Sequence, residues 1–281
     1  MSGSESYPAA ERRRLRELFG DVDFEVIPLP GALEKASVLP VGSVVTVTAS
    51  PSRGIQATVD LAAALEQSGY GAAPHLAARM ISDRAHLSKM LTTLGRNGVT
   101  RVFAIGGDPE PVGVYEDAVA LLRDMADLGH PFVEVGIAGY PEGHPDIDDR
   151  RLREALQVKA PMATYLVTQM CFDPTVIIDW VRSTREDGID LPIKLGVPGS
   201  VDTAHLLAVG ARIGVGDSLR MLAKNRGLVR MLRPGRYTAD RLIEGMADPD
   251  VDVDLDGLHV FTFNQVAATV QWRDKWVARL E

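Results

Sequence analysis

Short apolar runs rich in β-forming residues alternate along the chain with longer segments whose apolar residues recur at helical spacing. This alternation is typical of βα units, in which helical crossovers join parallel strands. Eight runs are predicted to be strands, at residues 24–29, 44–49, 72–78, 101–107, 133–139, 165–172, 193–199 and 259–264. The pattern therefore predicts the α/β class.

The segments between these runs have the faces and ends of amphipathic helices. Residues 82–98 begin with Ser82 as a candidate cap and end with Gly98 as a stop. The apolar residues of this segment share one face: Leu87, Met90, Leu91 and Leu94. Residues 114–129 follow the same rule, closing at Gly129 with a second apolar face: Ala118, Leu121, Leu122, Met125 and Leu128.

The predicted strands recur at a nearly constant interval. Central residues of the second to the seventh fall at positions 46, 75, 104, 136, 167 and 196, and this regularity indicates a supersecondary repeat. The longer interval to position 261 predicts extra helices at 216–227 and 238–248. Without a Pro/Gly/Ser-rich linker, eight units predict one (β/α)8 TIM barrel over residues 1–281, with an elaborated crossover before the last strand.

Composition narrows the classes of partner and the compartment. The net charge of −8 argues against broad binding to nucleic acid or to anionic membranes. The chain has neither an apolar signal region near its start nor a stretch of about 18 apolar residues, so a membrane partner is not expected. The single Cys171 excludes an internal disulfide and fits a reducing cytoplasm. Composition leaves the oligomeric state open.

Polar residues gather where the predicted strands end. In a TIM barrel the loops after the strands converge on one mouth, where the chemistry takes place. These residues are Glu25, Thr48, His75, Asp108, Tyr140, Glu142, His144, Gln169 and Asn264. Taken singly, a residue such as Thr48 or His75 more often has a structural role. Glu25 differs, because an unpaired carboxylate is costly to bury in an apolar strand, so it is either an acid with a shifted pKa or a partner in a structural ion pair. Together they predict a polar site for a small molecule.

Two other chemistries are disfavoured. The turn after the fifth strand offers four candidate metal ligands, Glu142, His144, Asp146 and Asp148. No second histidine or cysteine lies at a usual ligand spacing, so no metal site is predicted. A Schiff-base aldolase is disfavoured because Lys194, the candidate lysine, precedes the last residues of its strand.

Five motifs occur in the order and spacing of a known family. They are FEVIPLP at the first strand, APHL at the third, GYPEGHP after the fifth, VTQMCFD around the sixth and FTFN at the last. With these motifs, most of the chain resembles the methylenetetrahydrofolate reductase family. The resemblance implies a (β/α)8 barrel that reduces 5,10-methylenetetrahydrofolate to 5-methyltetrahydrofolate, normally with FAD relaying hydride from NADH or NADPH.

The resemblance also implies roles for individual residues. Glu25 resembles the general acid that helps to open the methylene bridge, and Asp108 and Gln169 resemble the pair that binds the amino-pyrimidine edge of the pterin. Phe261 and Asn264, in FTFN, are expected beside the substrate. The positions that match the family's flavin and nicotinamide pocket are Thr48, His75, Gly106, Gly107, Tyr140, Glu142 and His144.

The sequence departs from the family pattern where the family binds the flavin diphosphate. IGGD replaces the usual LRGD, so Gly106 stands at an arginine position. The matching positions before the sixth strand are Arg151, Glu154, Gln157 and Val158, with Lys159 nearby. Lost cationic partners weaken diphosphate binding, which favours direct hydride transfer from NADH or NADPH without tightly bound FAD. An ordinary FAD-dependent reductase and a non-catalytic folate-binding protein stay open as alternatives.

Overall fold

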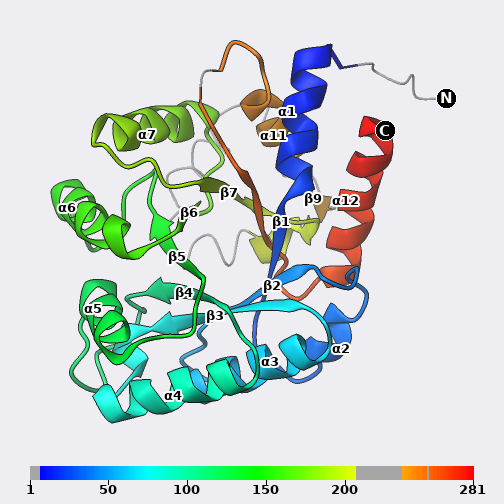
Figure 1. Ribbon diagram of the computed structural model, residues 1–281. Coiled ribbons are helices and arrows are strands. Elements are labelled where there is room, and N and C mark those ends of the chain that lie inside the picture. Colours follow the sequence, from blue (N-terminus) through cyan, green and yellow to red (C-terminus); the bar gives the residue numbers. More distant parts are fainter. Residues whose placement is uncertain (1–6, 207–235, 252) are drawn as a thin grey trace.

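The computed structural model describes residues 7–206, 236–251 and 253–281. Eight strands close into a barrel in the order β1–β10–β7–β6–β5–β4–β3–β2 (Figure 1). Every neighbouring pair of strands is parallel, including β1 with β10. Their bounds are β1 Val22–Val26, β2 Val44–Val47, β3 Gly71–Ala77, β4 Arg101–Ile105, β5 Glu134–Gly139, β6 Tyr165–Thr168, β7 Ile193–Pro198 and β10 Gly257–Phe261. The predicted TIM barrel is confirmed.

Helices surround this barrel on the outside (Figure 1). Their bounds are α1 Ala9–Gly20, α2 Ala32–Ala36, α3 Ile55–Gln67, α4 Arg84–Arg96, α5 Ala118–Leu128, α6 Asp149–Lys159, α7 Pro174–Glu186, α11 Asp240–Met246 and α12 Val266–Leu280. Helix α1 precedes the first strand and packs beside α12, where the rings of Phe19 and Trp276 are 5.1 Å apart. Within the described ranges, no helix is both long and apolar enough to cross a membrane.

Alternation along each strand separates two apolar regions. On β1, Phe24 and Val26 belong to the large core between strands and helices, whereas Asp23 and Glu25 contact side chains inside the barrel. The interior holds a smaller cluster of Phe103, Tyr165 and Val167. Gly136 makes room for it, because a Cβ there would lie 2.4 Å from both aromatic rings. The interior of the barrel is therefore filled with side chains, and polar groups such as Asp23 and Glu25 lie at particular positions along it.

Several predicted elements have different ends in the structure. Helix α4 is capped by Asp83, whose carboxylate accepts from the amide of His86, and not by Ser82. The first strand begins at Val22 rather than at residue 24, and the sixth ends at Thr168 rather than at residue 172. The apolar faces of α4 and α5 are buried as predicted.

The long crossover before the last strand is partly described. The predicted helix at 238–248 is present as α11, whereas the one predicted at 216–227 lies outside the described residues. The crossover also contains an antiparallel pair that the sequence did not predict, β8 Val201–Asp202 with β9 Arg236–Tyr237. An elaborated seventh crossover is thus confirmed in the part that the structure describes.

Candidate functional site

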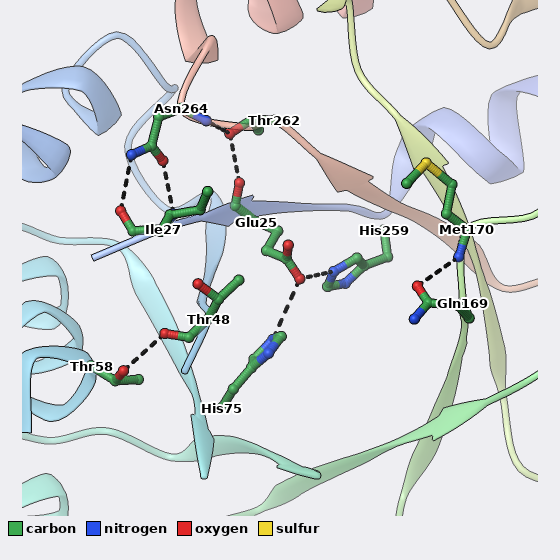
Figure 2. A network of polar contacts seen from close by, with 10 residues as sticks. All are labelled: Glu25, Ile27, Thr48, Thr58, His75, Gln169, Met170, His259, Thr262 and Asn264. Carbon is green, nitrogen blue, oxygen red and sulfur yellow. Dashed lines mark hydrogen bonds and ion pairs between the residues drawn. The ribbon is translucent and has the colours of Figure 1, made fainter. Parts of the chain in front are cut away.

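Glu25 lies near the carboxyl end of β1 with its side chain directed into the barrel (Figure 2). The side chain is 15% exposed, so its carboxylate is mostly removed from water. Its Oε2 lies 3.3 Å from Nε2 of His259 on β10 and 3.8 Å from Nε2 of His75 on β3. Three strands thus bring one carboxylate and two imidazoles together at the same level of the barrel.

His75 was predicted at this site, and His259 was not. Burial lowers the pKa of His75 to about 4, against a smaller opposite effect of the Glu25 charge, so this imidazole is neutral at pH 7. His259 is 1% exposed and its Nδ1 has no hydrogen-bond partner among the described residues. The signal for it in the sequence was a histidine inside the apolar run HVFTF, parallel to the glutamate inside FEVIP.

The same three side chains are of the kinds that bind divalent transition metals. Their candidate ligand atoms all lie within 4.8 Å of one another. A tetrahedral zinc site with bonds of roughly 2.1 Å requires ligand atoms about 3.4 Å apart, so the cluster is wider than a formed site. Its 3.3 Å contact is accounted for as a hydrogen bond.

Residues after β10 hold the end of β1 in place. Asn264 accepts from the amide of Ile27 at 2.8 Å and donates to its carbonyl at 3.0 Å (Figure 2). The hydroxyl of Thr262 donates to the carbonyl of Glu25 at 2.6 Å. Asn264 adopts φ +59, a conformation that asparagine tolerates better than most residues. The oxygen and the nitrogen of the Asn264 side-chain amide thus both hydrogen-bond to the backbone of Ile27, close to Glu25. The substrate-binding role of Asn264 stays a prediction.

The loops after β4 and β5 come together at the carboxyl end of the barrel. Gly107 has φ +91, which favours glycine, and a Cβ on Gly106 would meet open space. Burial raises the pKa of Tyr140, and the nearby charge of Asp108 raises it further. The Tyr140 ring contacts His144 edge-on at 5.6 Å.

The remaining predicted residues lie at the same end of neighbouring strands. Gln169 follows β6, and its Oε1 accepts from the amide of Met170 at 2.9 Å, which leaves Nε2 as the donor of the side chain (Figure 2). Phe261 ends β10 with its ring 5.1 Å from that of His259. Thr48 follows β2, and its carbonyl accepts from Thr58 at 2.8 Å. Glu142 lies half-buried in the turn after β5.

The basic residues of α6 are engaged elsewhere. Arg151 lies 3.5 Å from Asp148 and Arg153 lies 2.7 Å from Asp187, both at the exposed side of the helix. Lys159 is buried, its Nζ is 3.5 Å from the carbonyl of Ala138, and burial lowers its pKa to about 8. These three basic groups are thus either paired at the surface or buried.

A cavity of about 520 Å³ lies away from this site. It lies between α7 and the segment before β10, and its lining includes Arg185 and Asp256. Arg185 already donates to the carbonyls of Ile189 and Leu191, and Asp256 accepts from the amide of Ile193. These charged groups serve the local backbone, so we place the candidate site at Glu25.

Comparison with known proteins identifies the family. The model of the family described as methylenetetrahydrofolate reductase matches residues 29–205. Methylenetetrahydrofolate reductase (NADH) 1 of Arabidopsis thaliana is 27% identical over 191 residues, which are 61% of this chain and 29% of that protein. Methylenetetrahydrofolate reductase 1 of Schizosaccharomyces pombe is 34% identical over 109 residues, 36% of this chain and 18% of that protein.

A probable methylenetetrahydrofolate reductase (NADPH) of Caenorhabditis elegans is 28% identical over 123 residues, 41% of this chain and 18% of that protein. The chain spans less than a third of the length of these curated relatives. The family model covers well over half of the chain, although Glu25 and β10 lie outside the matched range. The chain belongs to the methylenetetrahydrofolate reductase family.

Proposed function

We propose that this protein reduces 5,10-methylenetetrahydrofolate to 5-methyltetrahydrofolate with NADH or NADPH. The observation that carries the proposal is Glu25, a mostly buried carboxylate at the carboxyl end of β1, where barrel enzymes place their chemistry. Membership of the reductase family supplies the substrate class. The names of the relatives include both NADH and NADPH, so we leave the choice of dinucleotide open.

Glu25 acts as the general acid in this proposal. It gives its proton to N10 of the folate while the bond between N10 and the methylene carbon breaks, and the electron pair of that bond goes to N10. The product of this step is a 5-iminium cation, which is a good hydride acceptor. Reduced nicotinamide supplies the hydride to the iminium carbon, which becomes the methyl group. Asp108 and Gln169 bind the pterin edge, with the carboxylate accepting and the amide Nε2 donating.

The hydride passes directly from the dinucleotide, without tightly bound FAD. Three features of the chain support this choice. Gly106 replaces an arginine of the family pattern, Arg151 and Arg153 of α6 are paired with Asp148 and Asp187, and Lys159 is buried. Each missing charge-assisted hydrogen bond to a diphosphate removes roughly 1.5–3 kcal/mol of binding free energy. Loss of several would weaken flavin binding by about three orders of magnitude.

The test is an anaerobic assay of NADH and NADPH oxidation with methylenetetrahydrofolate, using protein verified to be free of flavin by its absorption spectrum. We expect turnover without added FAD. A flavin that copurifies in stoichiometric amount, or turnover that requires added FAD, would instead support the ordinary flavoprotein.

The variant Glu25→Gln tests the acid and the third alternative together. It keeps the shape of the side chain but has no proton to deliver, so we expect folate binding within about threefold and turnover lowered at least 100-fold. Equilibrium binding and steady-state kinetics measure the two effects. If wild-type protein binds folate and never oxidises either dinucleotide, the chain is a non-catalytic folate-binding protein.

A further inference from the structure

Two imidazoles lie beside the Glu25 carboxylate, and neither takes part in the proposed proton and hydride transfers. Oε2 of its carboxylate lies 3.3 Å from Nε2 of His259, within hydrogen-bonding reach, and 3.8 Å from Nε2 of His75, beyond it. We infer that His259 is a positioning residue: its Nε2–H donates to Oε2 of Glu25 and leaves Oε1 to carry the proton for the substrate. This inference rests on the proposed function of Glu25.

The surroundings of His259 select the tautomer that this role needs. Its Nδ1 is buried and has no hydrogen-bond partner among the described residues. If the ring proton were on Nδ1, a donor would be buried without an acceptor, which costs more than burying a bare ring nitrogen. With the proton on Nε2, the donor points at a carboxylate oxygen, which is a strong acceptor. Of the two neutral tautomers, the Nε2–H form is therefore the favoured one.

A fixed donor at this position helps the acid after it has acted. When Glu25 releases its proton, negative charge develops on a carboxylate that is only 15% exposed. The Nε2–H of His259 is already directed at that charge, so it stabilises the product of proton transfer without reorganisation. The same bond holds Oε2 in the barrel interior and orients the other oxygen.

The other charged or titratable groups around Glu25 do not replace this donor. On β3, His75 is neutral because burial lowers its pKa to about 4. On β1 itself, Asp23 lies one level lower and is paired with Lys194 of β7 at 2.8 Å. On β2, the paired residue is Thr46, which carries no charge. Among the described residues, His259 is thus the side chain that forms a hydrogen bond with the Glu25 carboxylate.

Three variants measure the contribution of this contact. His259→Leu removes the donor, His259→Gln offers an amide N–H to the same oxygen, and His130→Gln changes a half-buried histidine outside the site as a control. For His259→Leu we expect kcat to fall at least tenfold with the KM for folate within twofold. The alkaline limb of its pH–kcat profile should move to higher pH, because the Glu25 anion has lost a stabilising donor. His259→Gln should recover at least a third of kcat.

A measurement on the wild-type protein tests the contact even if a variant folds poorly. Nitrogen-15 NMR of the histidine side chains at pH 7.5 should show His259 as the neutral Nε2–H tautomer. An Nδ1–H tautomer or an imidazolium would overturn the inference, as would a folded His259→Leu whose kcat and pH profile match the wild type.

The two proposals fail in different ways. If Glu25→Gln loses turnover while His259→Leu keeps both its rate and its pH profile, the acid is correct and the positioning role is wrong. If Glu25→Gln keeps full turnover, the proposed function of Glu25 is itself wrong.

Discussion

His75 is a titratable ring buried in the interior of the barrel, where the effect of burial outweighs the attraction of the Glu25 carboxylate 3.8 Å away. Its ring lies 4.8 Å from that of Phe103, and burial lowers its pKa from 6.5 to about 4. Between these two values the unfolded chain binds the proton and the folded chain does not. The stability that comes from keeping His75 neutral is thus fully present above pH 6.5 and is lost as the pH falls towards 4.

We expect this one residue to make the fold sensitive to acid. Between pH 7 and pH 5 it should lower the free energy of unfolding by about 2 kcal/mol. Urea denaturation of the wild type and of His75→Gln at both pH values measures the effect, and other titrating groups cancel in the comparison. An equal acid-induced loss in the two proteins would show that His75 is not the source.

Some residues of the site can be predicted from the sequence and others cannot, for a physical reason. Glu25 stands out in the sequence because a carboxylate in an apolar strand needs an explanation, whereas His259, in a similar apolar strand, was not predicted as a site residue. Asp23 was also missed as a strand residue. Its burial is possible because Lys194, 171 positions away in sequence, lies 2.8 Å from it. Partners brought together by closure of the barrel leave no local pattern.

At the scale of elements, the last helix is tied to the crossover by one carboxylate. Oδ1 of Asp240, the first residue of α11, accepts from the indole N–H groups of Trp272 and Trp276 on α12 at 2.6 and 2.7 Å. Both tryptophans are buried and also contact Phe19 of α1. This contact set joins the first and last helices where the barrel closes.

Asp240→Ala should therefore destabilise the fold strongly. It leaves two buried indole donors without acceptors, at a cost of about 1–3 kcal/mol each. Asp250→Ala removes an exposed carboxylate from the same crossover and should change stability by less than about 0.5 kcal/mol. Thermal or urea unfolding of both variants measures the difference in the free energy of unfolding. Similar losses of stability in the two variants would show that the hydrogen bonds of Asp240 do not stabilise the fold.

Elements were predicted well where the pattern is local and less well at their ends. The buried faces of α4 and α5 follow from the spacing of leucine and methionine alone. The choice of Asp83 over Ser82 as a cap depends on which side chain reaches the amide of His86. The pairing of β8 with β9 joins residues more than 30 positions apart, and no strand pattern marked either segment.

For the molecule as a whole, the two ends of the barrel have different tasks. Glu25 and the predicted site residues lie at the carboxyl ends of the strands, whereas Lys194 is the second residue of β7 and Asp23 the second of β1. Lys194 lies 2.8 Å from Asp23 and 2.9 Å from Asp21. Although burial alone lowers it, the pKa of Lys194 is raised by these two carboxylates, so the lysine is charged.

Lys194→Met should consequently separate stability from catalysis. It leaves Asp23, which is 1% exposed, without its cation, and breaking a buried pair costs roughly 3–5 kcal/mol. The double variant Asp23→Asn with Lys194→Met removes both charges and should regain part of that loss. Because the pair lies at the amino ends of the strands, the KM values for folate and dinucleotide should stay within twofold for the folded protein. A large rise in either KM with unchanged stability would place Lys194 in the binding site and contradict this division of the barrel.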